Sequence, residues 1–172
     1  MLKTAELFDL ERVPEALRAL LDAEYPWEAL TLLDGFGSTL QDNRSAGTVH
    51  PSAIVEGPLY MEEGAEVGPC AYLTGPVYLA AGAKVGHAAY LRGPVVLGPG
   101  AHVMHASEVK RSLLLGGARA PHFNYVGDSV IGHDVNLGAG VKLANFKTMG
   151  TQISVAGHDT GLRKFGAALG DG

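Results

Sequence analysis

The stretch that decides the fold is VGPCAYLTGPVYLAAGAKVGHAAYLRGPVVLGPGAH, residues 67–102, in which one 18-residue unit occurs twice. Each unit divides into three hexads, and an aliphatic residue recurs at every sixth position from Val49 to Leu115. The fourth residue after each of these is small or apolar until Arg119. The pattern therefore predicts two inward-facing side chains per hexad.

An α-helix has a period of 3.6 residues and cannot keep a six-residue apolar stripe on one face, whereas short strands joined by tight corners can. The repeat therefore predicts a parallel β-helix in which three hexads form one triangular coil. Neighbouring coils stack at about the usual strand spacing of 4.8 Å. Gly64, Gly82 and Gly100, each 18 residues from the next, are predicted to lie at corners.

The sequence before the repeat has helical rather than hexad spacing. Two short helices are predicted at 13–21 and 26–33, the second ending at Gly35 and Gly37, with a polar linker at 41–47. We expect residues 1–40 to cap an open end of the β-helix or to pack on it as an arm. The predicted division is a helical N-terminal arm and linker at 1–47 and the β-helix at 48–172.

The hexad frame is disturbed in two places. Aliphatic periodicity is lost after Leu115 and resumes at Ile131, so we predict an interruption of the spiral at 116–130. An irregular loop is predicted at 144–164, before 165–172 begins a further coil that stays unfinished. We expect either that the sequence is truncated there or that the exposed edge is buried against a partner. Departures from a repeat tend to fall at functional sites.

Composition limits the class of protein. The chain has 172 residues, 47% of them hydrophobic, a net charge of −5 and one cysteine. No apolar run is long enough to span a membrane, and the charged start MLKTAELFDLER does not resemble a secretory signal, so we expect a cytoplasmic protein. No basic surface for nucleic acid is indicated. The lone Cys70 predicts a buried or half-buried reduced thiol.

Four motifs carry a resemblance. In order and spacing they resemble the acetyltransferase half of bacterial bifunctional N-acetylglucosamine-1-phosphate uridyltransferases, a family of hexapeptide-repeat acyltransferases that form left-handed β-helices. The resemblance, not the periodicity, implies the left-handed form. Residues 24–30 and the arm also resemble short relatives of sugar nucleotidyltransferases that lack the nucleotidyltransferase domain. The four motifs are EVKRS (108–112), APHFNYVGD (120–128), NLGAG (136–140) and ANF (144–146).

The resemblance implies transfer of acetyl from acetyl-coenzyme A, as a co-substrate, to an amino-sugar phosphate such as glucosamine 1-phosphate. It implies a homotrimer with sites between subunits, and no tightly bound cofactor. His122 would be the general base, a task that suits a neutral imidazole near pH 7, and Asn136 would help to place either His122 or the amino group of the sugar. The implied binding residues are Arg92, Lys110 and Tyr125 for the sugar phosphate, Ala139, Asn145, Lys147 and Lys164 for acetyl-coenzyme A, and Lys142 and Arg163 as further cations for the coenzyme phosphates.

The residues themselves support an anion site. Arg92 and Lys110 are 18 residues apart and are predicted to stack one coil above the other. Like charges in that position repel unless an anion lies between them, which favours a phosphate.

Two other interpretations remain open. His87 and His105, also 18 apart, with His102 close by, are compatible with a zinc site in a carbonic-anhydrase-like trimer, although the third ligand is not obvious. The chain can also be a non-catalytic β-helix used for oligomerisation or for binding sugar phosphates.

Overall fold

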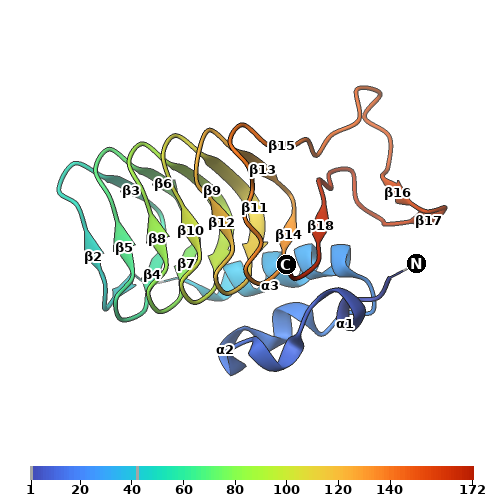
Figure 1. The fold of residues 1–172 in the computed structure, drawn as a ribbon, viewed down its shortest axis with the longest axis horizontal. Coiled ribbons are helices and arrows are strands. Elements are labelled where there is room, and N and C mark those ends of the chain that lie inside the picture. The colour runs from blue at the N-terminus through green and yellow to red at the C-terminus, as the bar shows by residue number, and fades with distance from the viewer. Residues whose placement is uncertain (1, 42) are drawn as a thin grey trace.

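The repeat folds into a parallel β-helix, as the hexad pattern predicts (Figure 1). The computed structural model describes residues 2–41 and 43–172. Strands of neighbouring coils pair in parallel 18 residues apart, as Tyr72 with Tyr90 and Lys84 with His102. This parallel solenoid is consistent with the left-handed form that the resemblance implies. Among the described residues, no helix is long and apolar enough to cross a membrane.

The coils present three faces. The first face consists of β3 (Ile54–Glu56), β6 (Tyr72–Thr74), the first parts of β9 (Tyr90–Leu97) and β11 (Glu108–Leu114), β13 (Tyr125–Gly127) and β15 (Lys142–Leu143). The second face consists of β1 (Arg44–Ser45), β4 (Leu59–Met61), β7 (Val77–Leu79), the later parts of β9 and β11, β14 (Val130–Ile131) and β18 (Ala168–Leu169). The third face consists of β2 (Thr48–Val49), β5 (Glu66–Val67), β8 (Lys84–Val85), β10 (His102–Val103) and β12 (Arg119–Ala120).

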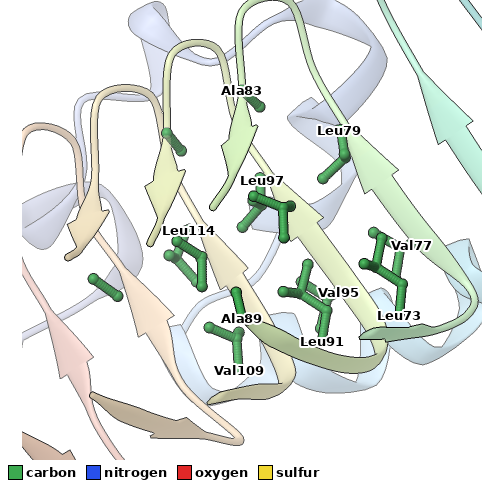
Figure 2. Close-up of a cluster of buried hydrophobic side chains, with 14 of the residues drawn as sticks. Leu73, Val77, Leu79, Ala83, Ala89, Leu91, Val95, Leu97, Val109 and Leu114 are labelled. Carbon is green, nitrogen blue, oxygen red and sulfur yellow. The ribbon is translucent and has the colours of Figure 1, made fainter. Parts of the chain in front are cut away.

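The core is a column of aliphatic side chains inside the coils (Figure 2). Leu73, Leu79, Leu91 and Leu97 have no exposed surface, and small residues such as Ala83 fill the positions between them. Gly64, Gly82 and Gly100 adopt positive φ angles of 73°, 68° and 63°, which confirms them as corner residues.

The predicted interruption at 116–130 is wrong, because β12, β13 and β14 continue the spiral there. The frame changes earlier: Arg92 pairs with Lys110, but Val95 pairs with Ser112, so the corner at Arg111 is one residue shorter. From this corner onward the coils repeat every 17 residues, as Leu114 with Ile131 shows. The prediction that Leu115 points inward is therefore wrong. Leu115 packs with the N-terminal arm, and Leu114 takes its place in the core.

Several short helices form the arm. They are α1 (Thr4–Leu7), the 3-10 helix η1 (Leu10–Arg12), α2 (Glu15–Arg18), the 3-10 helices η2 (Ala19–Leu21) and η3 (Pro26–Glu28), and α3 (Ala29–Thr39). Figure 1 shows α3 running alongside the coils, where Leu30 and Leu33 are fully buried in a second cluster with Val96 and Leu113 of the second face. The buried side chains of this helix thus pack on the second face of the β-helix. The linker predicted at 41–47 includes Asp42, which lies outside the described residues, and Arg44–Ser45 already forms β1.

Gly35 and Gly37 do not end the helix, contrary to prediction, since α3 continues to Thr39. A Cβ on Gly37 would lie 2.8 Å from Cβ of Pro94 and 3.1 Å from Cγ of Pro76, whereas one on Gly35 would meet nothing within 4 Å. Gly37 thus permits the close approach of α3 to two proline corners. Burial of the helix outweighs the weak helix propensity of glycine.

These two glycines give a matched prediction. Gly37→Ala is expected to lower the free energy of unfolding by about 1–3 kcal/mol, because the rigid proline rings must move. Gly35→Ala is expected to raise it by about 0.5–1 kcal/mol through helix propensity alone. Urea unfolding followed by fluorescence of the single tryptophan, Trp27, which is buried in the arm, measures both. Equal effects of the two substitutions would contradict the packing argument.

Cys70 is exposed, which corrects the prediction of a buried or half-buried thiol. It lies at a corner with a φ of 56°, and its sulfur is 3.8 Å from Oγ of Ser52 in the preceding coil. The corner turns its side chain outward, so the apolar hexad pattern does not apply to it.

Candidate functional site

The first face carries the predicted substrate-binding side chains. Arg92 of β9 and Lys110 of β11 are register partners, which confirms the predicted stacking. Tyr125 of β13 pairs with Glu108, two residues before Lys110. Because alternate residues of a strand share a side, these four side chains all project outward from the same sheet.

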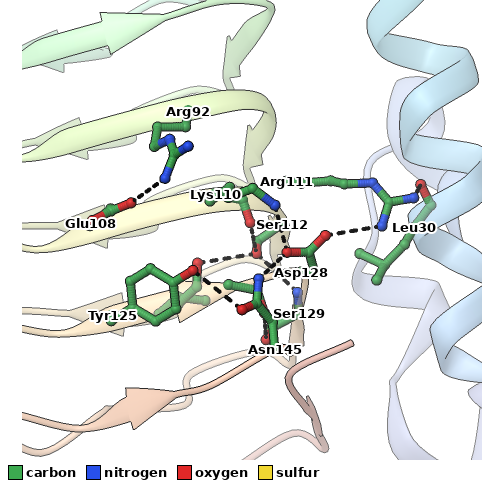
Figure 3. A network of polar contacts seen from close by, with 12 residues as sticks. Leu30, Arg92, Glu108, Lys110, Arg111, Ser112, Tyr125, Asp128, Ser129 and Asn145 are labelled. Carbon is green, nitrogen blue, oxygen red and sulfur yellow. Dashed lines mark hydrogen bonds and ion pairs between the residues drawn. The ribbon is translucent and has the colours of Figure 1, made fainter. Parts of the chain in front are cut away.

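Carboxylates of the chain itself accompany both cations (Figure 3). Nη1 of Arg92 lies 2.9 Å from Oε1 of Glu108, and this hydrogen bond raises the pKa of Arg92. Nζ of Lys110 lies 2.7 Å from Oδ2 of Asp128. The repulsion between stacked cations is therefore relieved within the protein, so their stacking alone does not require a phosphate.

Asp128 is the centre of a buried network. Its side chain is 1% exposed and is also contacted by Nη1 of Arg111 at 3.2 Å and by the amide nitrogen of Asn145, which donates a hydrogen bond to Oδ2 (Figure 3). Arg111 binds Asp34 of α3 through two nitrogens, at 2.9 and 2.5 Å. The network thus ties the arm to the corner at which the coils shorten.

Tyr125 is half-buried beside this network. Burial raises the pKa of its hydroxyl, and the negative charges of Glu108 and Asp128 raise it further. The hydroxyl therefore stays protonated at neutral pH and donates to Oδ1 of Asn145 at 3.4 Å. Asn145, 9% exposed, uses both ends of its amide within the protein.

His122 lies at the corner that leads from the third face to the first. Its side chain is exposed, and its backbone nitrogen donates to Oδ1 of the buried Asn124 at 2.9 Å. Asn124 in turn donates to the carbonyl of Gly138 in the next coil at 2.7 Å. Among the described residues, no hydrogen bond involves the His122 ring, so the imidazole is available to a ligand.

The other predicted residues are distributed over different parts of the coil. Asn136 is exposed on the third face, where it bridges to Arg119, and so lies apart from Arg92 and Lys110. Ala139 occupies the corner one coil beyond His122. One chain therefore brings Arg92, Lys110, Tyr125 and Asn145 to one region, but it does not bring Asn136 to them.

The predicted irregular loop contains a small hairpin of β16 (Ser154–Val155) and β17 (His158–Asp159), and it projects from the coils in Figure 1. Lys147 donates to the carbonyl of Gln152 at 3.0 Å, and Arg163 donates to that of Gly150 at 3.3 Å. Nζ of Lys164 lies over the Phe146 ring, 5.8 Å from its centre. Nζ of Lys142 donates to the carbonyl of Phe123. A cleft of about 470 Å³ separates this loop from the Lys110–Arg111 corner.

The histidines proposed for zinc do not converge. The rings of His87 and His105 stack with centres 5.5 Å apart, and His102 projects from the third face, where burial lowers its pKa. No group of three metal-ligating His, Cys, Asp or Glu side chains occurs among residues 2–41 and 43–172. A three-ligand site within one chain is therefore not formed by these residues.

A protein-family model described as the GMPPB C-terminal domain matches residues 73–163, more than half of the chain. This chain belongs to that family. The matched region includes the shortened corner, His122 and Asn145, and it ends just before Lys164.

Similar proteins are bifunctional. A Sulfurisphaera tokodaii protein described as a bifunctional sugar-1-phosphate nucleotidylyltransferase/acetyltransferase is 34% identical over 154 residues, covering 87% of this chain and 38% of that protein. A Methanococcus aeolicus protein described as bifunctional protein GlmU is 33% identical over 154 residues, covering 87% and 37%. The chain thus spans less than two fifths of these relatives. The resemblance to the acetyltransferase half of such proteins is confirmed as homology.

Sequence reasoning missed several residues around the site. Glu108 had a readable signal, because it lies two positions before Lys110 and must share its face. Arg111 and Asp128 had none in the hexad pattern, since they occupy corresponding corners of neighbouring coils with positive φ angles of 42° and 45°. No role of its own was predicted for Phe146, although it is 54% exposed and lines the cleft.

Proposed function

We propose that this chain transfers an acetyl group from acetyl-coenzyme A to the amine of an amino-sugar phosphate such as glucosamine 1-phosphate. The observation that carries the proposal is the position of the His122 imidazole, which is exposed and makes no hydrogen bond within the described residues. It lies at the edge of the face that presents Arg92, Lys110 and Tyr125. Homology with a protein whose name includes acetyltransferase supports the reaction class.

The paired cations retain capacity for a phosphate. Arg92 donates to Glu108 through one nitrogen, and a guanidinium has five N–H donors; its side chain is 43% exposed. Lys110 gives one of its three donors to Asp128. We infer that Glu108 and Asp128 hold these cations in place, and that their remaining donors bind the sugar phosphate together with the Tyr125 hydroxyl.

The proposed reaction needs one base. The amine nitrogen attacks the carbonyl carbon of the thioester while His122 accepts a proton from that nitrogen. The carbon–sulfur bond then breaks, the electron pair leaves on sulfur, and the thiolate takes up a proton as free coenzyme A. Asn124 orients the backbone of His122, and Asn145 positions Tyr125 rather than contacting the thioester.

We further propose a homotrimer. Asn136 lies on the third face and the phosphate-binding side chains lie on the first, so a second copy is required to bring an Asn136 to the site. A closed threefold assembly supplies such a contact at each of three equivalent sites. Ala139, exposed at the corner beside His122, would border the acetyl end of the coenzyme.

The test is release of free thiol from acetyl-coenzyme A. We expect release only when glucosamine 1-phosphate is present, with one N-acetylated sugar formed per thiol, measured with a thiol reagent and mass spectrometry. A reaction without the sugar phosphate reports background hydrolysis. No release above that background would contradict the proposal.

A second candidate function is binding of a sugar phosphate without catalysis. The geometry of one chain favours it, because Arg92, Lys110 and Tyr125 share the first face whereas Asn136, implied in catalysis, lies on the third. Calorimetric binding of glucosamine 1-phosphate with no thiol release would support this alternative.

A further inference from the structure

The corner that leads from the third face to the first carries a row of histidines. The backbone carbonyls of His87, His105 and His122 each accept a hydrogen bond from the residue that follows the same position in the next coil. The three histidines therefore occupy one equivalent position in three successive coils. Residues at such positions lie one above the other, about 4.8 Å apart. The proposed base, His122, is thus the last histidine of this row.

Two of these imidazoles stack on each other and the third does not. The ring centres of His87 and His105 are 5.5 Å apart, with an angle of 6° between the ring planes. In the described part of the chain, no such stack joins His105 to His122. Phe123, from the same coil as His122, packs against His105 instead, with the ring centres 5.0 Å apart and an angle of 76°. Phe123 therefore ends the stack just before the proposed base.

Phe123 differs from every other residue at its own position in the coil. The equivalent residues are small: Cys70, Ala88, Ala106 and Gly140. All five have positive φ angles, and that of Phe123 is 52°. A bulky residue rarely adopts this conformation, and alanine occupies the position twice, so the backbone does not require an aromatic ring there. The β-helix core does not require it either, since Phe123 is 54% exposed. Strained residues of this kind cluster at functional sites.

We propose that Phe123 positions the general base. By packing against His105, it prevents the imidazole of His122 from extending the histidine stack, and it leaves that ring available at the edge of the first face. Phe123 is thus a positioning residue, which acts through His122 and need not contact the substrate. Its role in catalysis rests on the proposed acetyl transfer, whereas its effect on the imidazole rests on the ring contacts along the row.

Phe123→Ala should let the imidazole of His122 stack on His105. A base must lie within hydrogen-bond reach of the amine, and a displacement of about 1 Å can cost about 100-fold in rate. We therefore expect the turnover number to fall by about tenfold or more. The Michaelis constants should change little, because the proposed phosphate-binding side chains are untouched. Phe123→Leu keeps an apolar side chain against His105 and should retain most of the turnover.

The decisive experiment repeats the substitution without the ring of His105. In His105→Ala/Phe123→Ala no imidazole remains beneath His122, so turnover should lie within about threefold of that of His105→Ala alone. A loss of substrate contact or of structure would instead lower turnover equally in both backgrounds. The matched control is Cys70→Ala, at the same position three coils earlier, which should leave turnover unchanged. Thermal unfolding of each variant verifies that it is folded.

Nuclear magnetic resonance measures the orientation of the imidazole without catalysis. The ring protons of His122, identified by their absence in His122→Gln, should lie upfield in Phe123→Ala relative to the double variant, because the face of the His105 ring shields protons stacked on it. Equal resonances in the two variants, or an equal loss of turnover in both backgrounds, would overturn the inference. The expected shift in a protein that releases no thiol from acetyl-coenzyme A would keep the effect of Phe123 on His122 and reject the proposed reaction.

Discussion

Replacing His122 with alanine is expected to lower the turnover number for acetyl transfer by about 10²- to 10⁴-fold, the usual contribution of a positioned general base. The Michaelis constants should change little, since Arg92, Lys110 and Tyr125 hold the sugar phosphate in the proposed site. The imidazole is exposed and makes no hydrogen bond within the described residues, so its loss should not affect folding. Steady-state thiol release at saturating acetyl-coenzyme A measures the effect.

The control for this experiment is His50→Ala. His50 is an exposed histidine on the first coil, whose ring contacts Ser52 at 2.9 Å, far along the β-helix from the site. It should retain wild-type turnover. If the His122 variant keeps turnover within about threefold of the wild type, another group accepts the proton and the assignment of the base is wrong.

The fold could be predicted from the sequence because each coil repeats the same local requirement. The core leucines recur at six-residue spacing, as Leu73, Leu79, Leu91 and Leu97 show. Each coil of a solenoid contacts only the neighbouring coils, so the core can be predicted from the repeat alone. The same regularity predicted that Lys110 stacks on Arg92. These inferences needed no information from distant parts of the chain.

The frame change could not be predicted because β11 has apolar surroundings on both sides, the β-helix core on one and the N-terminal arm on the other. Leu113 and Leu115 face the arm while Leu114 faces the core, so the run of three leucines satisfies either frame. Only the pairing across the Arg111 corner decides between them. The change of frame was therefore expected as an interruption at 116–130, several positions after the Arg111 corner where it occurs.

The arm shows the same limit in another form. Their low helix propensity predicts a helix end at Gly35 and Gly37, yet α3 continues to Thr39 and packs Gly37 closely against Pro76 and Pro94. The carboxylate partner of Lys110 could not be predicted either. Asp128 contacts Lys110 from the corresponding corner of the next coil, where its φ is 45°.

Asp128→Asn is expected to lower the free energy of unfolding by about 3 kcal/mol, the range observed when one partner of a buried ion pair is removed. Asparagine keeps the size of the side chain and tolerates the positive φ of 45°, so the change isolates the charge. Lys110 loses its only carboxylate partner in the described structure, and Arg111 keeps Asp34 alone. Urea unfolding measures the loss as a lower midpoint, with the dependence of the free energy of unfolding on urea concentration unchanged.

Asp134→Asn is the matched control. Asp134 also lies at a corner, with a φ of 58°, and also binds an arginine, Arg12, at 2.6 Å, but its side chain is 54% exposed. Arg12 lowers the pKa of this carboxyl, yet solvent screens the pair, so we expect little change in the unfolding midpoint. Equal shifts in the two variants would mean that burial adds nothing to the Asp128 network. A large shift confined to Asp128→Asn would instead show that the arm, the shortened corner and the loop are held together through one buried carboxylate.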